Sequence, residues 1–299
     1  MPDIRELLDD IKTTSVKNII LDTDTYNEVD DQFALAYAML SPERIRLLSV
    51  NAAPFLNSRS KSPADGMEKS YQEIFRIMKL VDPGAEIPCY RGSDSFLSSK
   101  TEPVESAAAD NIINTVMNSK EFVYIVAIGA ITNVASAIIK CPEITQKSAV
   151  IWLGGHALHY KDTKEFNLRQ DVPAAEVVFD SKIPLVQIPC LGVCSEFLTT
   201  LPELEYYLKG KNELCDYLVN ITGDYIKRGF AASKVIWNVT AIAVLTMPRA
   251  LDFEFRPTPC ITKELTYQIK PERHEYIYVS RIKRDPIFAD LFSKLAGKK

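Results

Sequence analysis

The chain has 299 residues, of which 46% are hydrophobic and 25% charged, and its formal net charge is -4. These values exclude long disordered tracts, collagen and coiled coil, and the mild acidity argues against a nucleic-acid partner. No apolar run of about 18 residues, the length that spans a membrane, is present. The polar N-terminus lacks the apolar core of a signal peptide, and the six cysteines include no C-x-x-C pair. We therefore expect a cytoplasmic protein with reduced thiols and no membrane partner.

Short apolar runs alternate with helical segments through the first two thirds of the chain. The apolar runs predict strands over residues 18–21, 45–50, 87–90, 123–128, 149–153 and 184–188. The segments between them predict helices over residues 31–40, 63–80, 107–117, 133–139 and 172–179. Because the strands are continuously apolar, the pattern indicates a mostly parallel central sheet with helices on both faces, as in Rossmann-like α/β folds.

The pattern changes after about Leu201. Helices are predicted over residues 214–226, 239–247 and 286–295, and β structure with alternating residues over 253–279. No internal repeat or flexible linker separates this portion from the rest. We therefore expect a single α/β domain over residues 1–299 with a mixed C-terminal portion.

An acidic cluster follows the first strand. Four carboxylates, those of Asp22, Asp24, Asp30 and Asp31, fall within ten residues at the start of a predicted helix. Ligands of open α/β sheets bind outside the carboxyl ends of the strands. Carboxylates packed together repel one another unless a cation is bound, and oxygen ligands suit Ca²⁺ or Mg²⁺ better than zinc. The alternative is that Asp30 only caps the helix and Asp22 is a solvated strand end.

This segment resembles the Asp-x-Asp-x-x-x-Asp-Asp signature of the nucleoside hydrolases (inosine–uridine preferring nucleoside N-ribohydrolases). It differs in having five rather than three residues between Asp24 and Asp30, and in lacking the usual Pro-Gly. Further similarities follow in the family's order over residues of roughly 18 to 250: Pro54-Phe-Leu-Asn57, Ile128-Gly-Ala-Ile-Thr-Asn133, Trp152-Leu-Gly-Gly155, Glu165-Phe-Asn167, and Asp171 with Ala174-Ala175-Glu176. The resemblance implies the nucleoside hydrolase fold.

The resemblance also implies an activity and a set of site residues. The activity is hydrolysis of the N-glycosidic bond of a ribonucleoside, with Asp24 as general base for a calcium-activated water. The ligands expected for Ca²⁺ are Asp24, Asp31, the carbonyl of Ile128 and Asn238. The residues expected to bind the substrate are Asp30, Asn57, Glu165 and Asn167, with Asp22 orienting the loop behind them. Members of the family act in purine and pyrimidine salvage and are commonly dimers or tetramers, so we expect a homo-oligomer.

One departure from the family pattern concerns the segment Ile236-Trp237-Asn238. The family carries an Asp that binds calcium where this chain has Asn238. An amide oxygen is still acceptable to calcium, but the site loses one negative charge, and we expect weaker metal binding. Trp237 stands where many members have a His, and an indole N–H cannot act as a general acid near neutral pH. We expect Trp237 to stack on the base or to form a wall of the pocket.

Several interpretations remain open. The chain could be a calcium- or nucleoside-binding relative with little or no turnover. A haloacid-dehalogenase-type phosphatase, opening with Asp22-Thr-Asp24, is less favoured because its second motif would have to be Gly223-Asp224 in a predicted helix. His156 and His159 follow a Gly-Gly turn and are either structural or donors to a leaving base. Asp171 is predicted to cap the following helix rather than to bind a ligand, Asn133 could also be a helix cap, and the sequence leaves the base preference open.

Overall fold

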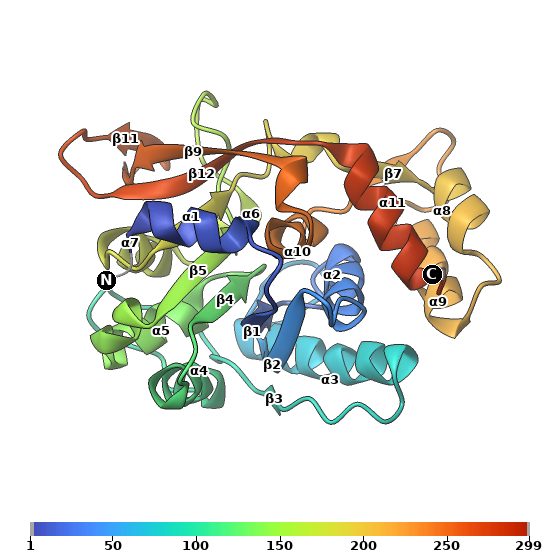
Figure 1. Cartoon of the computed structure of the whole chain (residues 1–299), viewed down its shortest axis with the longest axis horizontal. Coiled ribbons are helices and arrows are strands. Elements are labelled where there is room, and N and C mark those ends of the chain that lie inside the picture. Colours follow the sequence, from blue (N-terminus) through green and yellow to red (C-terminus); the bar gives the residue numbers. More distant parts are fainter. Residues whose placement is uncertain (1–2, 298–299) are drawn as a thin grey trace.

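The computed structural model describes residues 3–297, and its centre is an eight-stranded sheet in the order β3-β2-β1-β4-β5-β6-β12-β9 (Figure 1). The strands are β1 (Lys17–Thr23), β2 (Ile45–Ala52), β3 (Cys89–Tyr90), β4 (Val123–Ala127), β5 (Ser148–Leu153), β6 (Leu185–Ile188), β9 (Leu251–Pro257) and β12 (Glu275–Ile282). The strands from β3 to β12 are parallel, and β9 runs antiparallel to β12. The predicted mostly parallel sheet is confirmed.

Helices cover both faces of this sheet. One face packs against α1 (Ile4–Lys12), α2 (Asp30–Met39), α3 (Pro63–Val81) and α10 (Val239–Thr246). The same core extends to α8 (Leu201–Leu208), α9 (Glu213–Tyr225) and α11 (Arg284–Leu295), which pack on other helices rather than on the sheet. The other packs against α4 (Ala107–Asn118), α5 (Thr132–Lys140) and α7 (Val172–Asp180). Successive residues of β1 belong to opposite cores, Ile19 and Leu21 to the first and Ile20 to the second. This explains why the strand sequences are continuously apolar.

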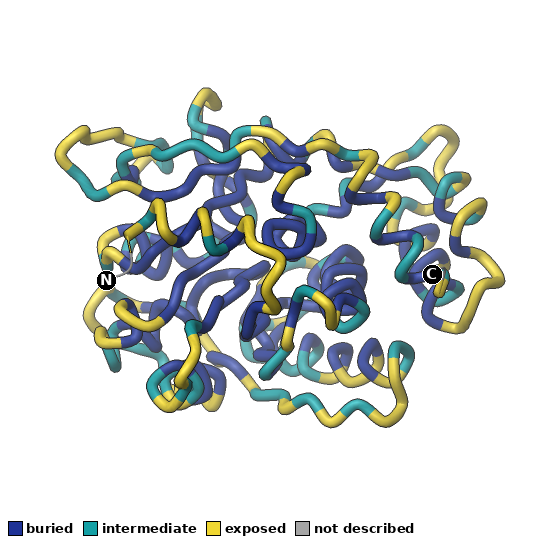
Figure 2. Tube along the Cα trace, viewed as in Figure 1, coloured by how far each residue is buried: buried dark blue, intermediate teal, exposed yellow. Residues whose placement is uncertain are grey.

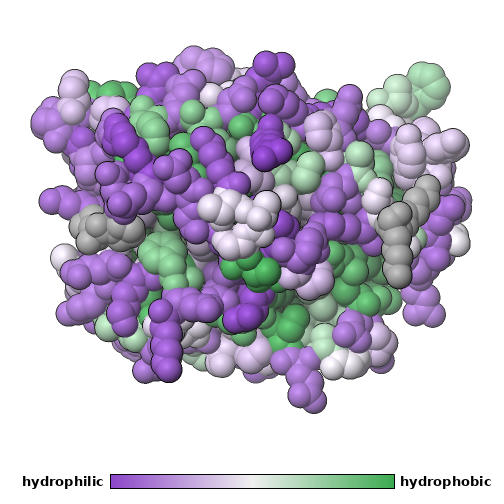
Figure 3. Space-filling model, in the orientation of Figure 1, coloured by the Kyte–Doolittle hydropathy of each residue, from purple (hydrophilic) through white to green (hydrophobic). Residues whose placement is uncertain are grey.

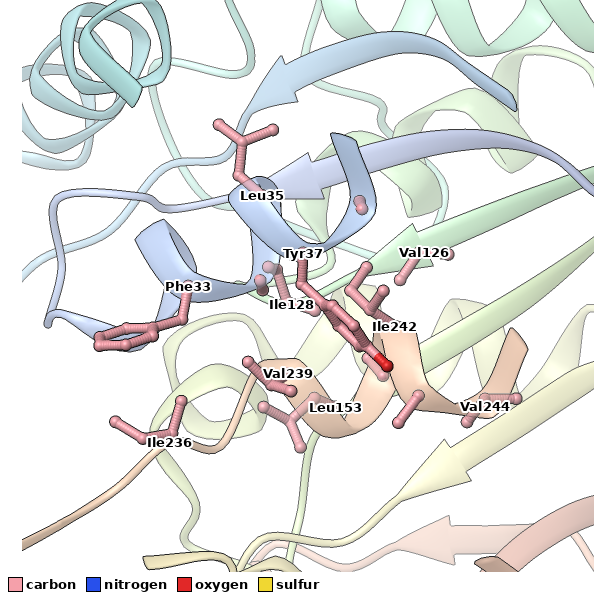
Figure 4. Packing of buried hydrophobic residues seen from close by; sticks show 14 of the residues in the cluster. Phe33, Leu35, Tyr37, Val126, Ile128, Leu153, Ile236, Val239, Ile242 and Val244 are labelled. Carbon is pink, nitrogen blue, oxygen red and sulfur yellow. The ribbon is translucent and has the colours of Figure 1, made fainter. Parts of the chain in front are cut away.

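The helices α2 and α10 bring the first and last thirds of the chain together. Figure 4 shows side chains of α2, such as Tyr37, meeting Val239 and Ile242 of α10 beside Val126 and Leu153 of the sheet. These side chains are fully or almost fully buried (Figure 2). The packing fixes the beginnings of both helices, Asp30 and Val239, near the carboxyl ends of β1 and β4.

Some elements were not predicted. The helix α1 has Ile4, Leu7, Leu8 and Ile11 on one side, and the Asp3 side chain caps it by accepting from the Arg5 N–H at 2.9 Å. The other additions are α8, the short helix α6 (Phe166–Gln170), and the antiparallel pair β7 (Leu198–Thr200) with β8 (Ser233–Val235). The antiparallel pair β10 (Pro259–Ile261) with β11 (Tyr267–Ile269) lies within the β structure predicted over 253–279. The strand predicted over 87–90 is reduced to Cys89–Tyr90.

The surface is mainly polar. Figure 3 shows hydrophilic side chains over most of one face, with hydrophobic residues in separate patches between them. Within residues 3–297, no helix combines the length and the apolar character needed to cross a bilayer.

Candidate functional site

A cavity of about 230 Å³ lies at the carboxyl ends of the central strands. Its walls come from the loop after β1, the residues that follow β4, β5 and β6, the short helix α6, and the residues before α10. The lining residues are Asn27, Glu28, Asp30, Asp31, Ile128, Leu153, His156, Glu165, Phe166, Asn167, Cys190, Leu191, Trp237 and Asn238. β1 pairs with both β2 and β4, so the strand order reverses here, where open α/β sheets bind ligands. The volume is just below the range of about 300–1,000 Å³ typical of drug-sized ligands, which suits a smaller molecule.

The carboxyl groups of Asp24 and Asp31 are buried together beside this cavity. Asp31 Oδ1 accepts a hydrogen bond from Thr23 Oγ1 at 2.6 Å. Within residues 3–297, three carboxylate oxygens of this pair have no hydrogen-bond partner: both oxygens of Asp24 and Oδ2 of Asp31. Burial, and then repulsion from Asp31, raises the pKa of Asp24 well above its usual value. Burial, and then repulsion from Asp30, does the same to the pKa of Asp31.

Asp22 lies behind this pair and does not line the cavity. Its Oδ2 accepts from Asn133 Nδ2 at 2.9 Å, and burial raises its pKa to about 7. Asn133 in turn accepts at Oδ1 from the N–H and the hydroxyl of Ser93, each at 2.8 Å. Asn133 is the second residue of α5 rather than its cap, so its side chain connects Asp22 to the loop after β3.

Asp30 begins α2 and meets a cation that sequence reasoning missed. Its Oδ2 accepts from the Asn238 N–H at 3.2 Å, and its Oδ1 lies 3.5 Å from Nζ of Lys234. Lys234 is buried on β8 and also forms an ion pair with Glu28. Burial alone would lower the pKa of Lys234, but the carboxylates of Asp30 and Glu28 raise it above its usual value. Burial raises the pKa of Asp30, although the charge of Lys234 opposes this shift.

Glu165 and Asn167 form the opposite wall. Glu165 caps α6, and its carboxylate accepts from the N–H groups of Gly155, Asn167 and Leu168 at 2.8–2.9 Å. Burial raises the pKa of Glu165 in spite of these donors. Asn167 Nδ2 donates to the carbonyls of Ile128 at 3.2 Å and Leu153 at 3.0 Å. These contacts tie the wall to the ends of β4 and β5.

Asn57 does not line the cavity. Its Nδ2 donates to Oδ1 of Asn27 at 2.6 Å, and it is Asn27 that lines the wall. Sequence reasoning did not single out Asn27, although its place between Asp24 and Asp30 was a possible signal.

The remaining candidates divide between the cavity and other places. Trp237, Asn238 and His156 line the cavity. Burial lowers the pKa of His156, whose Nδ1 accepts from the Leu191 N–H at 3.4 Å. His159 is not in the lining, and its ring lies 5.1 Å from that of Tyr160. Asp171 caps α7 by accepting from the Ala174 N–H at 3.0 Å, which confirms the favoured interpretation of this residue.

The donor set is compatible with a hard cation. Within residues 3–297, no group of three or more His, Cys, Asp and Glu side chains converges as a metal site. Two carboxylates are nevertheless adjacent, and buried oxygens without partners call for an ion or water. The carbonyl of Ile128 and the amide of Asn238 add neutral oxygens of the kind that Ca²⁺ accepts.

Comparison with known proteins identifies sequence relatives. Residues 19–279 match the family described as inosine-uridine preferring nucleoside hydrolase. The non-specific ribonucleoside hydrolase RihC of Escherichia coli (strain SMS-3-5 / SECEC) is 28% identical over 215 residues, which cover 62% of this chain and 67% of the relative. The pyrimidine-specific ribonucleoside hydrolase RihA of Escherichia coli O1:K1 / APEC is 31% identical over 192 residues. This match covers 56% of this chain and 58% of that relative, less than two thirds of its length.

Solved structures show the same fold. A purine-preferring ribonucleoside hydrolase from Gardnerella vaginalis superposes with a TM-score of 0.78 at 20% identity, covering 94% of this chain and 99% of that one. The plant nucleoside hydrolase PpNRh1 superposes with a TM-score of 0.76 at 16% identity and the same coverage. With the family match over most of its length, the chain belongs to the inosine-uridine preferring nucleoside hydrolases, a family of glycosidases that act on N-glycosyl bonds.

Proposed function

We propose that this chain hydrolyses the N-glycosidic bond of ribonucleosides to ribose and free base, with Asp24 as general base. The observation that carries the proposal is the pair formed by Asp24 and Asp31, whose buried oxygens lack partners beside a cavity of ligand size. Family membership and the names of the relatives support the same reaction class.

Hydrolysis requires a water that loses a proton as it attacks the anomeric carbon of ribose. The Asp24 carboxylate is the candidate acceptor, because neither of its oxygens has a hydrogen-bond partner within residues 3–297. A Ca²⁺ ion held by Asp24, Asp31, Ile128 and Asn238 would lower the pKa of that water. The neighbouring carboxylates stabilise the positive charge that develops on the ribose ring as its bond to the base breaks.

The substrate would be held by residues on both sides of the cavity. Asp30 and Glu165 offer carboxylate oxygens to ribose hydroxyls, and Asn167 and Trp237 border the same space. The leaving base takes the electron pair of the broken bond and needs a donor. His156 can donate a hydrogen bond to the departing base, because its Nδ1 accepts from the Leu191 N–H and the ring proton is therefore on Nε2.

A second candidate is a binding protein with little turnover. Asn238 removes one carboxylate from the expected metal site, and Lys234 adds a positive charge beside Asp30. Both changes weaken the attraction for a divalent cation. The phosphatase alternative loses its support because Gly223 and Asp224 lie inside α9 rather than after a strand.

The test is an assay on inosine, uridine and cytidine, with and without a chelator, in which free base is measured by chromatography. We expect release of base that the chelator abolishes, and the panel also gives the base preference. Asp24→Asn should lower kcat by about 10²–10⁴-fold, because it removes the general base. The matched control is Asp9→Asn on the exposed side of α1, which should leave kcat unchanged.

The outcome decides between the two candidates. Nucleoside binding without base release at high protein concentration would support the binding protein. Hydrolysis that persists in Asp24→Asn would contradict the role of this carboxylate. His156→Ala, assayed in parallel, should slow release of the base without abolishing nucleoside binding, and unchanged kinetics would remove His156 from the mechanism.

A further inference from the structure

We propose that Asn27, in the lengthened loop after β1, is the amide that recognises a ribose hydroxyl, and that Asn57 acts only by holding Asn27 in position. This inference rests on the proposed function and goes beyond it, because it names the residue that distinguishes ribose from deoxyribose. Asn27 is the middle one of the five residues between Asp24 and Asp30, where the family signature has three.

The backbone of Asn27 is fixed beside the acidic pair. Its N–H donates to the carbonyl of Asp24 at 2.7 Å, which closes a tight turn over residues 24–27. The side chain lines the cavity and is only 8% exposed. Asp30 and Asp31 line the same cavity, so a ligand there can contact this amide and both carboxylates at once.

The orientation of the two amides follows from one backbone contact. The N–H of Arg59 donates to Oδ1 of Asn57 at 2.8 Å, which requires an oxygen at that position. Nδ2 of Asn57 therefore faces Asn27, where it donates to Oδ1 at 2.6 Å and to the backbone carbonyl at 3.3 Å. The oxygen and the nitrogen of the Asn57 amide thus both form hydrogen bonds within the protein.

The same contacts leave one donor of Asn27 unused. Its Oδ1 is occupied by Asn57, and within residues 3–297 its Nδ2 has no hydrogen-bond acceptor. Because Asn27 lines the cavity, this donor is available to a ligand that enters it. Asn57 lacks such a free group, so Asn27 is the better candidate for contact with the substrate.

The loop that carries Asn27 is also held from outside the cavity. Arg59 donates from Nη1 to the carbonyl of Glu28 at 2.7 Å, and its guanidinium lies 4.3 Å from the ring centre of Tyr26. Arg59, in the segment after β2, therefore contacts the residues on both sides of Asn27. A preorganised amide loses little further conformational entropy when it binds a ligand.

A sugar hydroxyl matches this arrangement because it donates one hydrogen bond and accepts others. A carboxylate can only accept hydrogen bonds. Asp30 or Asp31 would therefore accept the hydrogen bond that the hydroxyl donates, while Asn27 Nδ2 donates a hydrogen bond to the hydroxyl oxygen. A site built to hydrogen-bond a hydroxyl rejects the analogue that lacks it, because the buried groups are left unpaired. Asn27 should therefore contribute to the preference for ribose over a deoxyribose.

The experiment compares inosine with 2′-deoxyinosine and 3′-deoxyinosine as substrates. Loss of one hydrogen bond worth about 1.4 kcal/mol corresponds to a tenfold change. Asn27→Ala should lower kcat/KM for inosine about tenfold while affecting one of the deoxynucleosides less, so that the ribose preference falls. Asn27→Asp retains the acceptor for Asn57 but not the free donor, and it should lose the same preference.

Further variants separate direct contact from positioning. Asn57→Ala should reduce the preference less than Asn27→Ala does, and the double variant should be no worse than Asn27→Ala, because both act through one amide. Asn114→Ala on the exposed side of α4 is the matched control and should change nothing. Thermal unfolding of each variant shows whether the fold is intact.

Four outcomes would overturn the inference or separate it from the proposed function. Full ribose preference in Asn27→Ala, with hydrolysis intact, overturns the inference alone. A larger loss in Asn57→Ala would make Asn57 the direct contact and also overturn it. If the wild type binds inosine without hydrolysing it, calorimetric affinities for the same three nucleosides replace the rates, and the inference stands only if Asn27→Ala removes their difference. Absence of both hydrolysis and binding overturns both proposals.

Discussion

Asn238 illustrates how a single side chain can change a site without changing its shape. It lines the cavity just before α10, and its N–H donates to Asp30, so its place in the fold is secure. Its own amide makes no capping bond to the helix and remains available to the cavity. What distinguishes Asn238 from an aspartate at this position is therefore mainly one negative charge.

Restoring this charge should strengthen the proposed metal site. Asn238→Asp is expected to bind Ca²⁺ about tenfold more tightly, since calcium affinity rises with the number of charged ligands. Calorimetric titration with Ca²⁺ and kcat/KM for the preferred nucleoside measure the effect. Asn118→Asp on the exposed end of α4 is the control. If Asn238→Asp lowers both affinity and activity, Asn238 does not lie at the metal.

The sequence predicted half of the fourteen residues that line the cavity, but not how they are connected. Asp30, Asp31, Ile128, Glu165, Asn167, Trp237 and Asn238 are in the lining, whereas Asp22, Asp24 and Asn57 are not. Asn57 could not be separated from Asn27, because both precede a helix in polar loops and the loop length alters which one reaches the cavity. Lys234 could not be predicted, since Ser233–Val235 carries no motif and only tertiary pairing buries it.

The loop from β1 to α2 depends on a strand that is distant in sequence. β8 pairs with β7 and delivers Lys234 to Glu28 and Asp30. The ammonium group also lies 5.2 Å from the ring centre of Tyr225, at the end of α9. A buried ion pair is costly to break because the remaining charge has no partner. This contact should therefore stabilise the loop that carries the acidic residues.

Replacing Lys234 tests whether its ammonium group stabilises this loop. Lys234→Met should lower the free energy of unfolding by about 3 kcal/mol near pH 8, because it leaves Asp30 buried without its partner. The loss should be smaller near pH 5, where Asp30, whose pKa is already raised, can become neutral. Urea unfolding at both pH values measures the difference. Lys209→Met, which removes an exposed ion pair on α8, should cost less than about 1 kcal/mol, and equal losses in the two variants would contradict the argument.

Among the helices and strands, the sequence predicted buried elements better than exposed or short ones. The parallel strands were recognisable because continuous apolar runs reflect burial on both faces. The helix α1 was missed because its polar residues dominate the composition, although Ile4, Leu7, Leu8 and Ile11 lie on one side. Short pairs such as β7 with β8 have too few residues to show a period.

Within residues 3–297, the buried carboxylate oxygens that lack a hydrogen-bond partner all belong to Asp22, Asp24 and Asp31. Asp22, Asp24 and Asp31 are fully buried with raised pKa values, and a cation is the proposed partner of two of them. The helices and strands around them form two continuous cores on opposite faces of one sheet. The stability of the whole fold should therefore respond to pH through this cluster.

The sign of the response follows from the direction of these shifts. An aspartate whose folded pKa exceeds its unfolded value binds more protons in the native state, so stability falls as pH rises between the two values. For Asp22 this window runs from 3.8 to about 7. In chelator, the melting temperature should be higher near pH 5 than near pH 8, and Ca²⁺ should remove most of this difference. Scanning calorimetry checks both, and a stability that rises with pH in chelator would contradict the burial of unpaired carboxyls.

The separation between the acidic loop and its counter-charge has a consequence for biosynthesis. Asp30 and Lys234 are 204 positions apart in the chain. A ribosome making the protein releases the aspartates long before the lysine that neutralises one of them. Because a buried carboxylate without its partner is costly, we expect this corner of the fold to be completed only after the final third of the chain emerges.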